Sequence, residues 1–117
     1  ACSFGKPSAG QAEQITKIYK AFDEAGVKSR MFTTQIEIQG RPGYLHAKAL
    51  VVDGTRAWVG SVNGSDAAFV RNREYGYFFD DASQVQKLRA IMNTDFESSD
   101  SESWRESLNC KKDYVPL

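Results

Sequence analysis

The side chains best suited to chemistry in this sequence lie close together near its middle. His46 is the only histidine of the chain, and Lys48 follows it after one residue. Because alternate residues of a strand point to the same face, a strand over this segment would present the base and the cation to one ligand. A lone histidine is more often a packed or surface residue, so this pair by itself is weak support for a site.

The residues that follow strengthen the hypothesis of a site. They complete the pattern H-x-K-x4-D-x6-G-S-x-N, which is formed by His46, Lys48, Asp53, Gly60, Ser61 and Asn63. Six specified positions at fixed spacing rarely match by accident. We therefore interpret the segment as a catalytic motif.

These residue types fit the cleavage of a phosphodiester. Without a metal, that reaction needs a nucleophile for phosphorus, donors for the phosphoryl oxygens and an acid for the leaving alcohol. His46 has the chemistry of the nucleophile or of the acid. Lys48 and Asn63 suit the nonbridging oxygens, whose charge grows toward the transition state, and Ser61 offers a further hydrogen bond.

Two carboxylates complete the predicted catalytic set. We expect Glu74 to hydrogen bond one ring nitrogen of His46, which would fix the tautomer and stabilise the imidazolium form. The alternative for Glu74 is a surface position at a strand edge. Asp53 precedes Gly54, and an aspartate at such a position most often bonds turn amides, so a structural role is favoured for Asp53 over a direct one.

Other residues near the motif have two interpretations each. The arginines could line an anionic pocket, but ordinary solvated surface is the favoured interpretation. The aromatic residues could form an acyl-chain or base-stacking surface, but positions in the core are favoured for them. These residues are Arg41, Arg71, Arg73, Tyr44, Trp58 and Phe69. Gly60 either allows two backbones to approach closely or is an ordinary strand-end glycine.

Short strands joined by turns must position the motif. The predicted strands are 27–33, 45–52, 56–60 and 74–79. The strand 45–52 is apolar except for His46 and Lys48, so we expect it to be buried on both faces. Asp53-Gly54 predicts a two-residue hairpin, and residues 39–43 predict a loop.

Helices are expected to flank these strands. The predicted helices are 12–26, a short one within 63–71, one that Ser83 caps and that extends to Phe96, and a turn at 104–108. The apolar stripes of the two longer helices are assigned to the core, and residues 97–103 to a solvated linker. The fold class is therefore α/β (α+β sandwich-like), a mixed β-sheet flanked by helices.

The composition limits the class of protein. A chain of 117 residues with 41% hydrophobic residues builds one core and is neither a disordered tail nor a fibre. Fifteen basic and fifteen acidic side chains cancel, which excludes the broad positive field of non-specific nucleic-acid binders. Any anion site must be local. No apolar run approaches the roughly eighteen residues needed to cross a bilayer.

Two cysteines, Cys2 and Cys110, leave the compartment open. A bridge between them would suit a secreted or periplasmic protein, whereas unpaired thiols would suit a membrane-associated cytoplasmic one. The first ten residues lack the features of an intact signal peptide, so we expect a mature or truncated N-terminus.

The motif resembles one HKD half-site of the phospholipase D superfamily, and Asn72-Arg73-Glu74 resembles the N-x-E element that follows it there. The segment from about residue 12 to residue 96 is similar to the C-terminal half of a bacterial two-motif, cardiolipin synthase-like member. Ala68 is one departure, because relatives often carry a serine there. The resemblance implies an extension over 1–11, an HKD half-domain over 12–97 that is incomplete as a fold, and an extension over 98–117.

The resemblance also implies the mechanism and a partner. Such enzymes work through a phosphohistidine intermediate with two motifs at a shared cleft and need no cofactor or metal. This chain would supply one half-site, and its partner would be an N-terminal half of the same enzyme or an identical chain. The length favours the first of these. In two-motif members the N-terminal histidine usually attacks, which favours the general acid over the nucleophile as the role of His46.

Three functions are compatible with the sequence. The first is a phosphodiesterase or transphosphatidylase that acts on phospholipid. The second is a metal-independent endonuclease of the same superfamily with nucleic acid as its substrate. The third is a non-catalytic phosphate-binding module. The neutral charge favours lipid, and the intact motif with Glu74 disfavours the third.

Overall fold

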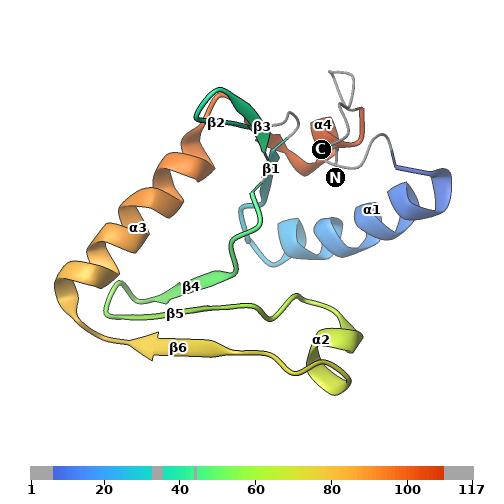
Figure 1. The fold of residues 1–117 in the computed structure, drawn as a ribbon. Coiled ribbons are helices and arrows are strands. Elements are labelled where there is room, and N and C mark those ends of the chain that lie inside the picture. Colours follow the sequence, from blue (N-terminus) through green and yellow to red (C-terminus); the bar gives the residue numbers. More distant parts are fainter. Residues whose placement is uncertain (1–6, 33–35, 44, 110–117) are drawn as a thin grey trace. The chain divides into compact units, whose positions relative to one another are not determined.

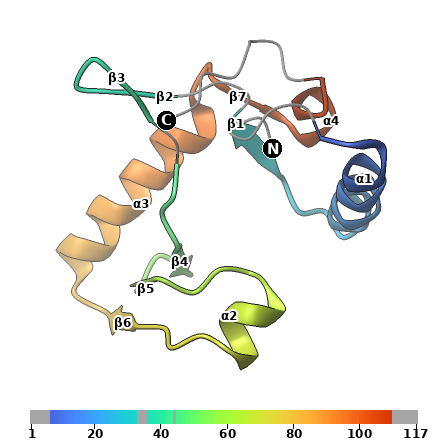
Figure 2. The ribbon, with the colours of Figure 1, turned by 45° about the vertical axis from the view of Figure 1, so that its right-hand side comes forward.

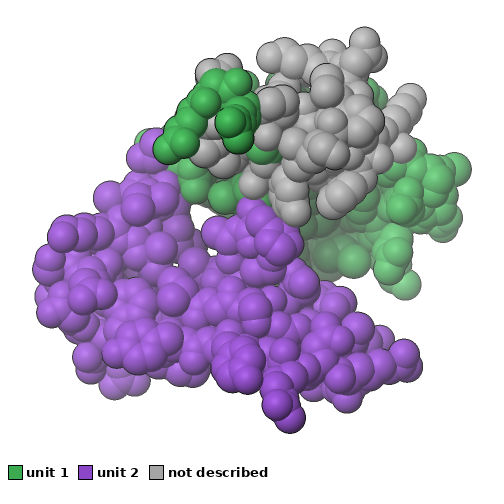
Figure 3. Space-filling view, viewed as in Figure 1, with its two compact units in different colours: residues 1–45, 95–117 green, residues 46–94 purple. Residues whose placement is uncertain are grey.

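A computed structural model of the protein describes residues 7–32, 36–43 and 45–109. The chain divides into two compact units, one formed by residues 1–45 with 95–117 and the other by residues 46–94 (Figure 3). Cys2, Cys110, Thr33 and Tyr44 lie outside the described residues. The predicted disulfide choice therefore stays a prediction.

Helix α1, Ala9–Glu24, belongs to the first unit and starts earlier than predicted. Ser8 caps it, because its hydroxyl accepts the Gln11 N–H while the Gln11 side chain accepts the Ser8 N–H. The chain leaves the helix through Gly26, whose φ of 75° is the left-handed conformation of a C-terminal glycine. No residue of α1 is buried, so the assignment of its apolar stripe to the core is wrong.

The segment predicted as a solvated linker contains a strand. Strand β1, Arg30–Phe32, pairs antiparallel with β7, Ser101–Ser103. The Arg30 guanidinium donates to both the hydroxyl and the carbonyl of Ser101, which is buried. Polar residues can form this strand because the main chain and Arg30 supply its hydrogen bonds.

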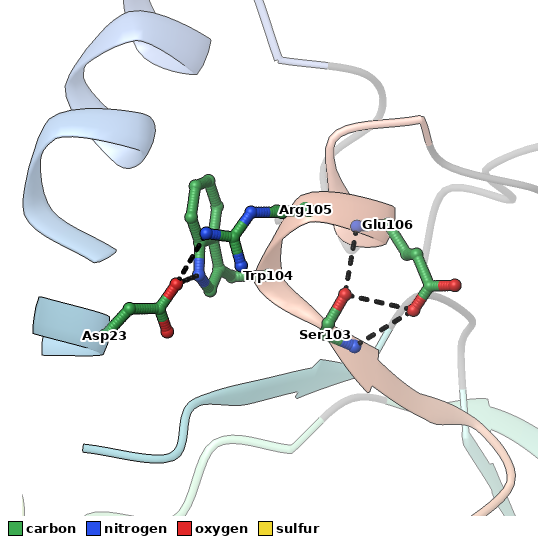
Figure 4. A network of polar contacts seen from close by, with 5 residues as sticks. All are labelled: Asp23, Ser103, Trp104, Arg105 and Glu106. Atoms are coloured by element: carbon green, nitrogen blue, oxygen red, sulfur yellow. Dashed lines mark hydrogen bonds and ion pairs between the residues drawn. The ribbon is translucent and has the colours of Figure 1, made fainter. Parts of the chain in front are cut away.

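Helix α4, Trp104–Ser107, confirms the predicted helical turn at 104–108, and it follows β7 directly. Ser103 and Glu106 form a capping box at its start (Figure 4). The buried Trp104 donates its indole N–H to Asp23 of α1 over 3.0 Å, and Arg105 forms a 2.7 Å ion pair with the same carboxylate. These contacts join the end of α1 to α4, and the Tyr19 ring of α1 stacks against Trp104 with 6.2 Å between the ring centroids. Ile18 and Phe22 of the same apolar stripe remain exposed.

The predicted loop at 39–43 is part of a hairpin. Strands β2, Ile36–Ile38, and β3, Arg41–Gly43, pair antiparallel around a two-residue turn. Gln39 and Gly40 have φ values of 53° and 73°, which match the right-handed twist of the strands that they join.

The second unit contains a three-stranded antiparallel sheet in the order β4-β5-β6 (Figure 1). Its strands are β4, Ala49–Val52, β5, Arg56–Gly60, and β6, Gly76–Phe79. Asp53 and Gly54 have φ values of 53° and 67°, and Thr55 N–H donates to the Val52 carbonyl over 3.0 Å. The predicted Asp-Gly hairpin is confirmed.

Two helices complete this unit. Helix α2, Asp66–Val70, is capped by Ser65, and α3, Ala82–Glu97, rises on one side of the sheet (Figure 2). The prediction that Ser83 caps α3 is wrong, because the Asp81 carboxylate accepts the Gln84 N–H over 2.9 Å. An acid just before the helix satisfies a free amide and the positive end of the helix dipole together.

The expectation that β4 is buried on both faces is also wrong. One face of the sheet carries Ala57, which is 2% exposed, and Val51, which lines a pocket together with Met92 of α3. The opposite face is open, with Leu50 53% and Phe78 76% exposed. An apolar run in the sequence does not indicate which face of the strand a neighbouring helix or sheet covers. The predicted α/β fold class, with strands flanked by helices, is confirmed, although the described strands form small antiparallel sheets rather than one mixed sheet.

Among the described residues, none of the helices combines the length and apolar composition that a bilayer span requires.

Candidate active site

The predicted site residues come from three strand ends of the second unit. His46 and Lys48 precede β4, Ser61 and Asn63 follow β5, and Glu74 precedes β6. In an antiparallel sheet of this order, the start of β4, the end of β5 and the start of β6 lie at the same end (Figure 1). The topology therefore brings five of the six predicted residues to one end of the sheet.

His46 and Lys48 lie just outside the strand that was predicted to contain them, since β4 begins at Ala49. The Lys48 carbonyl accepts the Gly60 N–H over 3.0 Å, which extends the pairing of β4 with β5 by one residue. The Lys48 ammonium donates to the His46 carbonyl over 2.7 Å, and the His46 side chain is exposed. This local bond holds the cation beside the backbone of the histidine.

Glu74 is the centre of a hydrogen-bond network. The Ser61 hydroxyl donates to one carboxylate oxygen over 2.5 Å, and the Asn72 side-chain amide donates to the other over 3.1 Å. The Ser61 hydroxyl also accepts the Tyr75 N–H over 3.1 Å. These donors lower the pKa of Glu74, first through Ser61 and then through Asn72, and the charge of Lys48 acts in the same direction. Glu74 is therefore held in its ionised form.

The network changes the role expected for Glu74. Within the described part of the chain, the carboxylate hydrogen bonds Ser61 and Asn72 rather than the His46 ring. The side-chain donors engage both carboxylate oxygens. Ser61 lies close to Glu74 because β5 and β6 are adjacent, whereas Asn72 is only two residues before Glu74 in the chain. What Glu74 provides at this end of the sheet is a fixed negative charge near Lys48.

Ser61 and Asn63 differ in their availability. The single hydroxyl proton of Ser61 points to Glu74, and an ionised carboxylate is a strong acceptor, so phosphate would have to compete for it. The Asn63 side chain is exposed and hydrogen bonds none of the residues that the structure describes. Its amide is free to donate to an incoming anion, in keeping with the predicted phosphate contact.

Asp53 is not brought to the other site residues. It lies in the turn at the far end of β4, five residues from Lys48, which is roughly 15 Å along an extended chain. Its carboxylate is exposed and forms no hydrogen bond with the described residues, so the turn amides are not its partners. Asp53 adopts a φ of 53° in the turn, and aspartate tolerates this conformation better than most residues do. Its role is therefore to allow the turn of the hairpin.

Gly60 has a steric role that the sequence left open. A Cβ atom at Gly60 would collide with the Trp58 ring and lie 2.5 Å from the Tyr75 carbonyl oxygen. Gly76, its partner across β5 and β6, would collide with the same ring. The indole of Trp58 therefore lies over two glycines beside the site. Sequence reasoning missed Gly76 and this role of Trp58, and the signal was a tryptophan two residues before the Gly-Ser pair.

The flanking residues mostly follow the favoured interpretation. Arg41, Arg71 and Arg73 are exposed, as expected of solvated surface. Phe69 was expected in the core but is 72% exposed, because α2 turns Ala68 rather than Phe69 inward. Among residues 7–32, 36–43 and 45–109, no three histidine, cysteine or acidic side chains cluster in a way that could hold a metal ion.

Comparison with known proteins identifies the family of the chain. The family described as "Cardiolipin synthase, PLD-like domain" matches residues 5–96. The chain is also 30% identical over 78 residues to "Probable cardiolipin synthase YwiE" of Bacillus subtilis (strain 168). The aligned segment covers 62% of this chain and 16% of that protein. No solved structure matches the chain.

The chain therefore belongs to the phospholipase D superfamily, in its cardiolipin synthase-like branch. It spans about 16% of the length of the curated relative that it matches. The predicted membership of this superfamily is confirmed.

Proposed function

We propose that this chain supplies one half-site of a phospholipase D-type phosphodiesterase or transphosphatidylase that acts on phospholipids. The observation that carries the proposal is the meeting of His46, Lys48, Asn63 and the ionised Glu74 at one end of the sheet. The family match, which covers most of the chain, supports the same chemistry. The second half-site would come from another half of the same enzyme or from an identical chain.

In the proposed reaction, an imidazole nitrogen of the second half-site attacks phosphorus. The phosphorus–oxygen bond of the leaving alcohol breaks, and that oxygen takes a proton from the His46 imidazolium. Water or an acceptor alcohol then gives its proton to His46 and attacks the phosphohistidine, which releases the first imidazole. A single histidine in the chain is consistent with the need for a partner.

The other residues serve the charges of this cycle. Lys48 and Asn63 donate to the nonbridging oxygens, where negative charge increases toward the transition state. The ionised Glu74 adds a negative charge at the end of the sheet where His46 and Lys48 also lie. Ser61 and Asn72 keep Glu74 ionised and in place.

A direct assay tests the proposal. The chain, alone and mixed with a polypeptide that carries a second HKD half, is incubated with phosphatidylglycerol vesicles and separately with single-stranded DNA, both with chelator. We expect release of the head group or its transfer to an added alcohol, and no cleavage of DNA. Arg56→Gln, an exposed residue away from the site, is the matched control for His46→Asn.

Cleavage of DNA alone would replace this proposal with the endonuclease. A mixture that binds phospholipid but cleaves neither substrate would favour the non-catalytic module.

A further inference from the structure

The segment between Asn63 and Glu74 forms an exposed surface beside the site. It contains α2, which lies at the site end of the sheet, away from the Asp53-Gly54 turn (Figure 1). Ala68 anchors the helix with 5% exposure, whereas Phe69 and Val70 are 72% and 74% exposed. Two large apolar side chains thus project into solvent next to the residues proposed to do the chemistry.

Positive charge follows these apolar side chains directly. Arg71 and Arg73 are exposed, and neither forms an ion pair within the part of the chain that the structure describes. The acid of α2, Asp66, lies in the opposite, first turn of the helix. We call Phe69, Val70, Arg71 and Arg73 the rim segment.

The backbone holds the rim segment in place. The N–H groups of Arg71 and Asn72 both donate to the Ala67 carbonyl, over 3.0 and 2.8 Å. The Asn72 side chain hydrogen bonds Glu74, whereas Arg71 and Arg73 on either side of it are exposed. Little ordering is therefore needed for the rim segment to bind a partner.

We propose that the rim segment docks on the surface of an anionic phospholipid bilayer. Phe69 and Val70 would enter the boundary between head groups and acyl chains, and Arg71 and Arg73 would pair with lipid phosphates. Apolar side chains beside cations are the composition that binds this boundary, because burial of the former and attraction of the latter act together. This inference rests on the proposed function, because that function makes phospholipid the substrate. It adds the surface through which the site reaches that substrate.

Charge favours a bilayer over a second copy of the chain as the occupant. In a twofold dimer the same patch meets itself, so a second rim segment would bring two more guanidinium groups to the contact. An anionic bilayer instead supplies the missing negative charge. The net charge of the chain is zero, so this local pair of cations is what an anionic surface would recognise.

Vesicle binding by the whole 117-residue chain tests the proposal. Cosedimentation is measured with vesicles of equal parts phosphatidylcholine and phosphatidylserine, and with phosphatidylcholine alone. We expect binding that needs phosphatidylserine. Phe69→Ser should weaken it by roughly tenfold or more, and Arg71→Gln with Arg73→Gln by roughly twentyfold.

Matched controls come from the same unit. Ile91→Ser removes an exposed apolar side chain of α3, and Arg56→Gln with Lys87→Gln removes two exposed cations, so both should leave binding unchanged. In Phe69→Trp, acyl-chain-brominated lipid should quench the added fluorescence, while Ile91→Trp should show no such added quenching. Circular dichroism confirms that each variant is folded.

Three results would overturn the proposal. They are equal binding losses in rim and control variants, no quenching at position 69, and a lipid-free dimer that Phe69→Ser abolishes.

Cleavage of a monodisperse short-chain phospholipid is measured in parallel. If that cleavage persists without vesicle binding, the docking surface is wrong and the proposed function stands. If rim-dependent binding occurs and no phospholipid is cleaved, the proposed function is wrong and the docking surface stands.

Discussion

The Ser61 hydroxyl donates a 2.5 Å hydrogen bond to the Glu74 carboxylate, and this bond joins the end of β5 to the segment that leads into β6. The same pair of segments is joined by the main chain, because Ser61 N–H donates to the Tyr75 carbonyl over 2.9 Å. A serine that the sequence assigned to phosphate is thus part of the structure that fixes an acid of the site.

The first prediction concerns the pKa of Glu74. Ser61→Ala removes the donor that lowers this pKa most, so the pKa should rise toward that of an ordinary glutamate, while Ser61→Thr should keep it low. Carbon-13 NMR titration of the side-chain carboxyl checks this. Ser83→Ala, an exposed serine of α3, is the control and should leave the Glu74 pKa unchanged.

The same network predicts a pH dependence of stability. A carboxyl whose pKa is lowered by folding stabilises the folded state above its ordinary pKa, and this contribution disappears as the pH falls through the lowered pKa. The difference in free energy of unfolding between the parent chain and Ser61→Ala should therefore be largest near neutral pH and shrink in acid. A difference that grows in acid would contradict the assignment.

His46→Asn should abolish turnover in the paired enzyme and leave the fold intact, since the side chain is exposed and its loss leaves no cavity. The expected loss is several orders of magnitude, as for other members of a cooperating catalytic set. Activity and thermal unfolding are measured on the same samples. Retention of a tenth of the parent activity in a sample free of parent protein would remove His46 from the proposed mechanism.

Asp53 should behave in the opposite way. Asp53→Asn keeps a residue that tolerates positive φ, so both stability and turnover should stay close to those of the parent. Asp53→Val should destabilise the hairpin by about 1–3 kcal/mol, because a β-branched residue is strained at this φ. Denaturant unfolding with a parallel activity assay separates the two effects. Loss of turnover in a fully stable Asp53→Asn protein would return Asp53 to the chemistry.

Gly76 provides a test of the packing beside the site. Gly76→Ala should destabilise the chain by about 1–3 kcal/mol, because the added methyl collides with Trp58. Gly64→Ala is the matched control, since no atom lies within 4 Å of its added Cβ. Combining Gly76→Ala with Trp58→Val should recover part of the loss. Additive effects in the double variant would mean that the two residues are not coupled.

Turnover should survive excess chelator. His46 is the only histidine, and no cluster of three potential ligands occurs among the residues that the structure describes. Initial rates with and without EDTA should agree. An activity that EDTA removes and that zinc or magnesium restores would contradict the phosphohistidine mechanism.

Local features could be predicted from the sequence because neighbouring residues determine them. The Asp53-Gly54 hairpin depends on two residues that tolerate positive φ, and α2 depends on the Ser65 cap and a few residues after it. The spacing of the motif likewise identified the superfamily, because it is a property of the chain and not of its folding.

Only the tertiary structure decided which residues meet. The pairing of β1 with β7 joins segments about seventy residues apart. Its main-chain hydrogen bonds do not depend on residue type, and the added contact of the Arg30 side chain with Ser101 cannot be recognised from the residues next to either one in the sequence. The place of Asp53 away from the site and the contact of Glu74 with Ser61 depend on the order and direction of β4, β5 and β6. Composition and periodicity describe how polar a segment is, whereas the neighbours that cover it or bond it come from elsewhere in the chain.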